Sequence, residues 1–495
     1  MIDAVRGMRD VLPGDLDTQA RVATQLDAVL ASYGYQQIDL PIVERRDLYL
    51  RKLGEELVGK VYEFSFSGRD LALRPEWTAS VLRAYTAHMQ GQPLPLRLRY
   101  NGPVFRNERP QRATYRQFTQ VGVELVGGPA PRADAECMAL ACAGLDTVGV
   151  PSYVVRVGHI GLIRSVLAAL GLAERTQGLL VWSLERMRTQ GVNVIRAQLE
   201  HEAEEPAFDP ALLQGVDDAQ AEALLLRSLA EIGVNLRFGT RSPEAIVGRL
   251  VRKLRRTESR GAVEHALALL EQFSQLQGPP AEALPRAETL LHDFGLPTAE
   301  LDGLHAVLEL AEAHGVTDER LVVDFGLGRG LHYYTGAIWE IYTDDGLQLC
   351  GGGRYDDLVA ALGGRQPVPA VGFAYGLERV VQAARMQPSD ERQADVLVIS
   401  ADDMSYPYAL QVAQELRERG YIATVDVRNR SVASNLRDAA RRDVACAIVG
   451  PDEQAEASML WRDAGAREER RVRLDDVTNR TTTMNQSADS GLRKA

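Results

Sequence analysis

The stretch that decides the fold runs from Tyr100 to Gly127 and reads YNGPVFRNERPQRATYRQFTQVGVELVG. Strand-like text flanks a polar, arginine-rich loop over residues 107–115, which predicts a long β-hairpin. Arg106 and Glu108 stand two residues apart in that text, so we expect both side chains on one face of a sheet, where they can serve one ligand. A structural ion pair is the alternative for an isolated R-x-E pattern.

The text on both sides of this hairpin predicts the rest of a mixed sheet. Residues 17–33 have helical spacing, and short strands are expected at 36–42, 61–66, 71–73 and 96–100. Residues 160–316 are rich in Leu, Ala, Glu and Arg at helical periodicity, which predicts a helical insertion. Strands return at 321–325, 337–343 and 347–349, the last ending in Gly351-Gly352-Gly353, and a helix is expected to start near Ala374.

The last quarter of the chain predicts a separate α/β domain, because strand and helix text alternates as βαβαβ from ADVLVIS to CAIVG. One of its helices is expected over Ser431–Arg441, and the polar end of the chain is expected to be disordered. The expected domains are a first part of the catalytic core (1–159), the helical insertion (160–316), the second part of the core (317–386), the α/β domain (394–478) and the tail (481–495).

Composition limits the class of protein. The chain has 495 residues, 45% of them hydrophobic and 25% charged, and no apolar run long enough to span a membrane, so we expect a soluble protein without membrane contact. The first residues contain no apolar signal region, which favours the cytoplasm. Four scattered cysteines without a CxxC pair argue against disulfides and a zinc site, and no protein-bound metal is expected. The net charge of −12 leaves RNA binding to local basic strips.

The quoted stretch resembles motif 2 of class II aminoacyl-tRNA synthetases, and specifically that of the histidyl-tRNA synthetase family. The resemblance extends from about Arg6 to Gly450. It implies an α+β fold: a mixed, mainly antiparallel catalytic sheet with a helical insertion, followed by an α/β domain like the family's anticodon-binding domain. Pro41 in DLPIVE is similar to the motif 1 proline of the dimer interface, although a strand-end proline is the ordinary interpretation.

The resemblance also implies how ATP is held. In the family the arginine that matches Arg106 binds the α-phosphate, and the residue that matches Glu108 holds the adenine. Motif 3 appears as GFAYGLERV, in which Arg379 resembles the arginine for the γ-phosphate. A planar guanidinium suits a phosphate well.

A histidine pocket is implied by two further stretches. FGLGRGLHYYTG and LCGGGRYDDLV resemble the two histidine-specific motifs, so Arg329 is expected against the reacting phosphate. For a lone pair of tyrosines such as Tyr333 and Tyr334, core packing is the ordinary interpretation. The residues that the resemblance assigns to histidine are Glu76, Thr78, Gln120, Glu124, Arg329, Tyr333, Tyr334 and Tyr355.

The implied activity is that of a histidine–tRNA ligase. Histidine would be activated with ATP and Mg²⁺ to the adenylate and passed to tRNA(His) by a homodimer. Gln111 resembles the loop residue that meets the acceptor stem, with a solvated loop residue as the equal alternative.

Four departures from the family pattern bear on this expectation. The motif 2 loop has Ala113-Thr114 in place of Gly-Arg, which removes a cation that would face phosphate. His332 stands where the family has Asp. Trp77 stands where the family has Gly and is expected to cap or narrow the histidine pocket. In the last domain the lysine-rich text is absent, and Arg437, Arg441 and Arg442 are the cations that remain.

Two other functions fit the same fold. One is the non-catalytic, histidine-binding regulatory subunit of ATP phosphoribosyltransferase, whose partner is the catalytic subunit of that enzyme. The other is a paralogue that activates histidine without charging tRNA. Fold alone does not separate them. The retained arginines and the terminal α/β domain favour the ligase.

Overall fold

The computed structural model describes residues 2–50, 59–109, 113–203, 216–231, 243, 247–248, 251, 260–328, 333–384 and 395–478. The chain forms two compact units: one comprises Met1–Val11 and Thr18–Gln387, and the other comprises Leu12–Asp17 and Pro388–Ala495. Gln111, Arg329, His332 and the expected tail lie outside the described residues.

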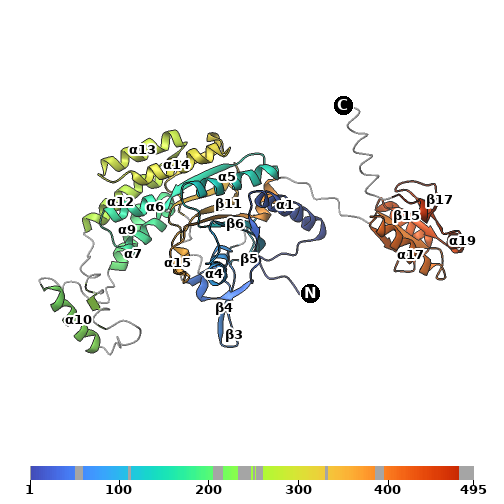
Figure 1. Cartoon of the computed structure of the whole chain (residues 1–495), viewed down its shortest axis with the longest axis horizontal. Coiled ribbons are helices and arrows are strands. Elements are labelled where there is room, and N and C mark those ends of the chain that lie inside the picture. The colour runs from blue at the N-terminus through green and yellow to red at the C-terminus, as the bar shows by residue number, and fades with distance from the viewer. Residues whose placement is uncertain are drawn as a thin grey trace. The chain divides into compact units, whose positions relative to one another are not determined.

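A nine-stranded mixed sheet forms the framework of the first unit (Figure 1). Its spatial order is β1-β5-β6-β12-β11-β10-β7-β9-β8. The strands are β1 (Gln36–Gln37), β5 (Leu96–Phe105), β6 (Gln117–Val126), β7 (Val154–His159), β8 (Gln277–Gly278), β9 (Leu321–Asp324), β10 (Ala337–Tyr342), β11 (Gln348–Arg354) and β12 (Ala370–Gly376).

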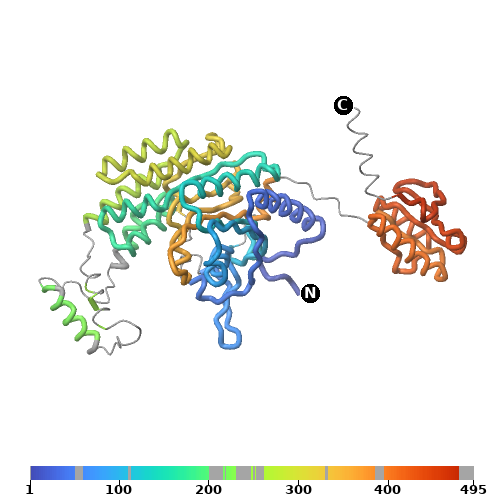
Figure 2. The backbone as a smooth tube through the Cα atoms, in the orientation of Figure 1, coloured from blue at the N-terminus to red at the C-terminus, as the bar shows by residue number. Residues whose placement is uncertain are grey.

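The expected hairpin is confirmed, since β5 and β6 pair antiparallel over their whole lengths. β6 then pairs with β12, which follows it by more than two hundred residues in sequence, with Glu124 opposite Gly372. Figure 2 shows these two distant parts of the chain side by side in one sheet. The sheet is therefore completed late in the sequence, as expected.

Strand alternation gives this sheet a core face and a second, more polar face. On β12, Val371, Phe373 and Tyr375 belong to the main hydrophobic core, and the Tyr375 hydroxyl donates to the Leu140 and Ala141 carbonyls of α5 (Arg132–Thr147). The intervening residues of β12 belong to the opposite face.

The helical text predicted over 160–316 is confirmed for the described residues. Most of these helices share the hydrophobic core of the sheet, whereas α10 packs its Ala221 and Leu225 with Val247 and Val251 in a separate cluster. The helices are α6 (Ile160–Ala169), α7 (Glu174–Trp182), α8 (Leu184–Gln190), α9 (Val192–Ala203), α10 (Asp218–Glu231), α12 (Arg260–Gln275), α13 (Pro280–Asp293) and α14 (Ala299–Ala313).

A small antiparallel sheet and three helices precede the hairpin in the described residues. The sheet has the order β2-β4-β3. Its strands are β2 (Val43–Arg45), β3 (Glu63–Phe66) and β4 (Arg69–Leu73), and the helices around it are α1 (Pro13–Ser32), α2 (Asp47–Leu50) and α4 (Thr78–His88). Helix α4 follows β4 after four residues, so the segment Arg74–Trp77 is held between a strand and a helix.

The second unit is a five-stranded sheet of order β14-β13-β15-β16-β17. The three strands expected from the βαβαβ pattern pair in parallel, and β16 and β17 add an antiparallel extension. Its elements are β13 (Val396–Ser400), α17 (Tyr406–Glu418), β14 (Ala423–Val425), α18 (Val432–Arg441), β15 (Ala445–Val449), α19 (Pro451–Ala455), β16 (Ser458–Arg462) and β17 (Arg470–Arg473).

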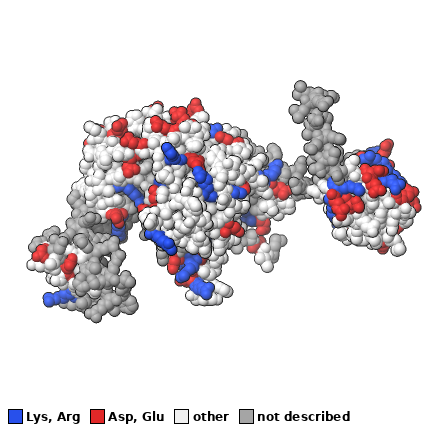
Figure 3. All heavy atoms as spheres, in the orientation of Figure 1, with Lys and Arg blue, Asp and Glu red and all other residues white. Residues whose placement is uncertain are grey.

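Charges of both signs lie on the visible face of this second unit (Figure 3). Two of the three cations predicted in α18 and at its end form local ion pairs: Arg442 lies 3.1 Å and Arg441 3.8 Å from the Asp438 carboxylate.

Among the described residues, no helix is both long and apolar enough to cross a membrane.

Three local predictions were wrong. Strand β5 ends at Phe105, so Arg106 and Glu108 follow the strand instead of lying on it. The three glycines at 351–353 lie inside β11 because their small size allows close packing: a Cβ on Gly352 would stand 2.5 Å from the Gly372 carbonyl. Ala374 belongs to β12, and the helix that follows, α16 (Leu377–Ala383), begins three residues later.

Candidate active site

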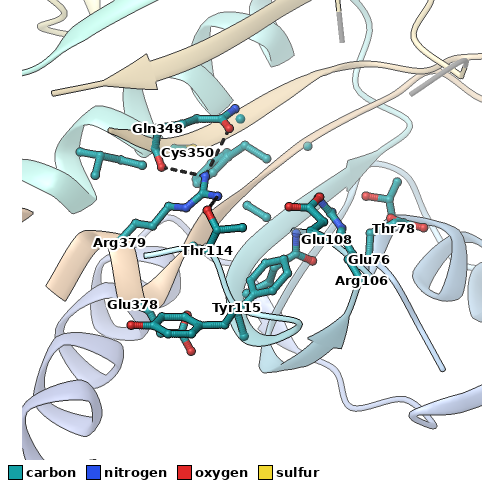
Figure 4. Close-up of a pocket in the computed structure, with 18 of the residues that line it drawn as sticks. Glu76, Thr78, Arg106, Glu108, Thr114, Tyr115, Gln348, Cys350, Glu378 and Arg379 are labelled. Carbon is teal, nitrogen blue, oxygen red and sulfur yellow. Dashed lines mark hydrogen bonds between the residues drawn. The ribbon is translucent and has the colours of Figure 1, made fainter. Parts of the chain in front are cut away.

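One polar pocket lies on the second face of the large sheet, at strands β5, β6, β11 and β12 and the start of α4 (Figure 4). Its floor includes Gly372, Ala374 and Gly376 of β12, whose small or absent side chains leave space in the pocket. The expected site residues that line it are Glu76, Thr78, Arg106, Glu108, Gln120, Tyr333, Tyr334, Tyr355 and Arg379.

Glu124 is not part of the pocket lining and lies directly behind it, bonded to the lining residues Thr78 and Tyr100. Its side chain is inaccessible to solvent, and its Oε1 accepts hydrogen bonds from the Thr78 hydroxyl at 2.7 Å and the Tyr100 hydroxyl at 3.0 Å. Its Oε2 has no partner among the described residues. Burial raises the pKa of the Glu124 carboxyl well above its usual range, and the negative charge of Glu76 adds to this rise. An unpaired buried carboxylate oxygen is costly, which marks this atom as a ligand-binding group.

Glu76 supplies a second carboxylate at the start of α4. Its Oε1 accepts the Ala79 N–H at 3.0 Å, one of the N–H groups that the first turn of a helix leaves without an intrahelical partner. Its Oε2 is buried without a partner among the described residues, and burial raises the pKa of the carboxyl. The helix start therefore fixes Glu76 in place and leaves one oxygen available to a ligand.

Gly372 leaves room between two polar atoms that lack partners. A Cβ at this position would stand 2.1 Å from Glu124 Oε2 and 2.6 Å from the Tyr355 hydroxyl. Tyr355 Oη and Gln120 Oε1 are also buried without partners among the described residues. The register that places Gly372 opposite Glu124 thus lets Glu124 Oε2 and the Tyr355 hydroxyl pack closely against the backbone of β12, beside the polar pocket that Gly372 lines.

Three tyrosine rings form the aromatic wall of the same end. The ring of Tyr333 lies 4.9 Å from that of Tyr334 and 5.6 Å from that of Tyr355, measured between centroids. All three are almost fully buried and also belong to the main core, so the core and pocket interpretations of this pair both hold. Such a wall suits a flat, partly polar ring.

Cationic groups mark the other end of the pocket. Arg106 donates from Nε to the Pro75 carbonyl at 2.8 Å, which anchors the guanidinium beside Glu76 and Glu108 (Figure 4). Glu108 lies 3.7 Å from Lys60. The bond to a carbonyl fixes the direction of the Arg106 guanidinium.

Arg379 lies at the start of α16 and reaches toward the motif 2 loop. It donates to the Ala113 carbonyl at 3.2 Å, to the Thr114 hydroxyl at 3.3 Å and to the Gln348 carbonyl at 3.3 Å. Figure 4 shows the Thr114 and Gln348 contacts. All three acceptors are neutral, so the charge of Arg379 remains available to an anion.

The expectation for Trp77 was wrong. Its side chain is buried but does not line the pocket; it belongs to a small cluster with Val81, Leu98, Tyr100 and Val104. The reason is that its ring stacks on the rear of Tyr100, with centroids 4.8 Å apart and planes at 9°. Trp77 therefore backs the pocket and does not cap it.

Among the pocket residues that the sequence did not predict are Tyr100 and Glu378. Tyr100 lines the pocket and bonds Glu124, and Glu378 accepts the Thr119 N–H with both carboxylate oxygens at 2.9 and 3.1 Å. Burial raises the pKa of Glu378. The signal for Tyr100 was hairpin register: it pairs with Gly122, two residues from both Gln120 and Glu124.

A comparison with known proteins matches most of the chain. Residues 7–237 and 241–380 match the histidyl-tRNA synthetase family, and residues 393–482 match an anticodon-binding domain. The histidine–tRNA ligase of Methanocaldococcus jannaschii is 30% identical over 97% of this chain and 99% of its own length. That of Archaeoglobus fulgidus is 32% identical over 91% of this chain and 92% of its own.

Solved structures support the fold. The histidyl-tRNA synthetase of Nostoc sp. PCC 7120 has a TM-score of 0.63 at 21% identity and covers 96% of this chain and 97% of its own. An ATP phosphoribosyltransferase regulatory subunit/histidyl-tRNA synthetase from Bacillus halodurans has the same TM-score and identity over 91% of this chain and 98% of its own. At these identities the likeness concerns the fold alone.

The sheet, the polar pocket on it and the second α/β unit are those of a class II aminoacyl-tRNA synthetase. More particularly, the chain belongs to the histidyl-tRNA synthetase family.

Proposed function

We propose that this chain is a histidine–tRNA ligase, which activates histidine with ATP and transfers it to tRNA(His). The observation that carries the proposal is one pocket with two buried acceptors at one end, Glu76 Oε2 and Gln120 Oε1, which have no partner among the described residues, and two guanidinium groups at the other end. Such a pocket fits an ammonium-bearing amino acid beside a polyphosphate.

Histidine occupies the buried end. The carboxylates, the hydroxyls and the tyrosine wall contact its α-ammonium group and its imidazole. These side chains supply both hydrogen-bond acceptors and donors. The residues proposed to bind it are Glu76, Thr78, Gln120, Glu124, Tyr333, Tyr334 and Tyr355, with Arg329 outside the described residues. Tyr100 joins this set through its bond to Glu124.

ATP occupies the cationic end, where Arg106 binds the α-phosphate, Arg379 the γ-phosphate and Glu108 the adenine. The histidine carboxylate attacks the α-phosphorus, a P–O bond forms, and pyrophosphate leaves with the electrons of the bond that breaks. Arg106 stabilises the charge that develops on the α-phosphate oxygens. The 3′-terminal hydroxyl of tRNA then attacks the acyl carbon, and AMP leaves.

Mg²⁺ supplies charge neutralisation on the triphosphate when it is bound. Among the described residues no cluster of three or more His, Cys, Asp or Glu side chains could hold a metal ion. The ligands of the ion would therefore be mainly phosphate oxygens and water, with Glu378 as a carboxylate of the pocket wall.

The tRNA contacts involve both units. We propose that Gln111 meets the acceptor stem and that the second unit binds the anticodon, in a cytoplasmic homodimer that includes the segment around Pro41. The family match and the anticodon-domain match support these proposals. The domain boundaries at 159, 316 and 386 are part of the same proposal.

A second candidate is a paralogue that activates histidine without charging tRNA. One observation favours it. Thr114 stands where the family has arginine, and its hydroxyl accepts a hydrogen bond from Arg379. The motif 2 loop therefore has one cation fewer for tRNA phosphates.

The test is histidine-dependent ATP–pyrophosphate exchange, followed by charging of tRNA(His). Exchange and charging together support the ligase. Exchange without charging selects the paralogue, and histidine binding without any exchange selects the regulatory class. Glu124→Gln, which removes the buried charge but little volume, should lose exchange at low histidine, whereas a matched change outside the pocket, Glu136→Gln, should not.

A further inference from the structure

Three flat side chains form a stack behind the histidine end of the pocket. The guanidinium carbon of Arg74 lies 3.5 Å from the centroid of the Trp77 ring, and the other face of the stack is closed by Tyr100, 4.8 Å away and nearly parallel. Arg74 and Trp77 are each 1% exposed.

The stack is anchored at its far end. Arg74 donates from Nε to the Pro103 carbonyl at 2.8 Å and from Nη1 to the Leu40 carbonyl at 2.9 Å. Trp77 donates from Nε1 to the Gly102 carbonyl at 3.4 Å. These bonds tie Arg74 and Trp77 to the backbone of β5 and to the segment before β2, so that neither side chain is free to rotate.

Gly102 gives the stack its space. A Cβ on this residue would lie 2.8 Å from an Arg74 nitrogen and 2.8 Å from a Trp77 ring carbon. Any side chain at position 102 would therefore displace one member of the stack. Gly102, Arg74 and Trp77 therefore pack in a specific, complementary way.

Tyr100 is the member of the stack that lines the pocket, and it links the stack to Glu124. The Tyr100 ring lies between Trp77 and the pocket, and its hydroxyl donates to Glu124 Oε1 at 3.0 Å. Thr78, on the first turn of α4 and next to Trp77, donates to the same oxygen at 2.7 Å. The second oxygen of Glu124, Oε2, thereby lies against Gly372 and has no partner among the described residues.

We propose that Trp77 is a positioning residue for histidine: by holding the ring of Tyr100 in plane, it fixes the Tyr100–Glu124 hydrogen bond and so the direction of the free carboxylate oxygen. The proposal rests on the proposed function, because it names histidine as the ligand of that oxygen. Trp77 itself touches neither substrate.

The first experiment measures the KM values of pyrophosphate exchange for three variants. Trp77→Leu keeps an apolar side chain but removes the flat ring, and it should raise the KM for histidine about tenfold, equivalent to ~1.4 kcal/mol, with the KM for ATP unchanged. Trp77→Phe keeps an aromatic face and should recover most of the loss. Val81→Ala opens a cavity in the same cluster without touching the stack and should lower the melting temperature alone.

A double-mutant cycle then tests the route. Tyr100→Phe keeps the ring but removes the hydroxyl that bonds Glu124, so it should raise the KM for histidine by itself. If Trp77 acts through that hydroxyl, adding Trp77→Leu to Tyr100→Phe should change the KM little further. Effects that multiply, or a Trp77→Leu enzyme with unchanged KM for histidine and only a lower melting temperature, overturn the proposal.

Failure of the proposed function looks different. If the wild-type chain shows no histidine-dependent exchange, the ligase proposal fails, and the same variants are compared by calorimetric titration with histidine alone. Selective loss of histidine affinity in Trp77→Leu, recovered in Trp77→Phe, still supports the positioning role. Equal histidine affinity in all variants overturns it.

Discussion

Two buried carboxyl groups govern the chemistry of the pocket at the scale of single residues. Glu76 and Glu124 each use one oxygen for local structure and hold the other without a described partner. Burial raises the pKa of both carboxyls in the ligand-free protein. A cationic group brought to these oxygens favours the ionised form, so ligand binding and deprotonation are coupled.

Histidine binding should therefore release a proton. We expect the effect at pH values above about 7.5, where the ligand's imidazole is neutral and proton release belongs to the protein. Calorimetry in two buffers of different ionisation enthalpy measures it. Glu124→Gln should abolish the release and weaken binding about tenfold or more. Equal proton release in the variant would assign it to another group.

The same raised pKa has a consequence for the stability of the ligand-free protein. A folded-state pKa above the ordinary Glu value of 4.5 means that the folded protein holds the proton more tightly than the unfolded chain. The free energy of unfolding contributed by Glu124 therefore falls as pH rises above that value. Glu124→Gln should raise the melting temperature at pH 8 and change it less at pH 5, as thermal unfolding followed by circular dichroism will report; an equal shift at both values contradicts the assignment.

Arg379 should matter to ATP and not to histidine. Its guanidinium bonds neutral acceptors, so a phosphate can take their place, and the loss of a charge-assisted bond costs about 1.5–3 kcal/mol. Arg379→Ala is thus expected to raise the KM for ATP about tenfold to a hundredfold in pyrophosphate exchange. The exposed Arg365 offers the control: Arg365→Ala should leave both KM values unchanged, and a rise in the KM for histidine in Arg379→Ala would contradict the assignment.

Residue identities were largely accessible from the sequence, but their contacts were not. The pattern named Glu76, Gln120 and Glu124 because acids and amides within apolar text need a partner. It did not name Tyr100, because a tyrosine in a strand is most often core, and only the register of β5 on β6 brings its hydroxyl to Glu124. The position of Trp77 was predicted wrongly for the same reason. The space that its ring occupies depends on Gly102, which lies on another element, strand β5.

At the scale of elements, the junction of β7 and α6 depends on one histidine. His159 ends β7 and caps α6: its Nδ1 accepts the Leu162 N–H at 2.9 Å. Burial, and then the nearby charge of Arg354, lowers the pKa of His159 from 6.5 to about 4. The imidazole is thus neutral in the folded protein at neutral pH, with the cap nitrogen unprotonated.

This cap predicts a loss of stability in mild acid. Between pH 6.5 and about 4 the unfolded chain binds a proton at His159 that the folded protein does not, so the free energy of unfolding falls as pH falls, by at most about 3 kcal/mol. His159→Asn keeps a side-chain acceptor for the helix and cannot become charged. Urea unfolding at pH 7.5 and pH 5 should show a smaller loss in the variant; equal losses in both proteins would contradict the role.

The boundaries of elements show why sequence patterns stop short. The sequence pattern located β6 and β10 closely, because both strands are rich in β-branched, aromatic and other apolar residues. It did not predict that β11 continues through three glycines or that β12 extends to Gly376. Within a short stretch of sequence, glycine usually predicts a turn. Their role appears only in the assembled sheet, where Gly352 and Gly372 let backbones and side chains approach closely.

For the whole molecule, the decisive feature is that each unit has its own hydrophobic core. The core of the first unit consists of residues before 381, and the clusters of the second consist of residues after 395. Every residue that lines the pocket lies between Glu76 and Arg379. The proposed activation of histidine therefore depends on the first unit, and we expect the second unit to contribute to tRNA recognition.

A chain that ends at Gln387 should separate the two activities. We expect it to unfold cooperatively, to retain pyrophosphate exchange with little change in the KM for histidine or ATP, and to charge tRNA(His) about a hundredfold less efficiently, because the contacts proposed for the anticodon are lost. Exchange and charging measured side by side with the full chain provide the comparison. A truncated chain that melts cooperatively but has lost exchange would mean that the second unit takes part in activation, and the assignment of the whole reaction to the pocket on the large sheet would then be wrong.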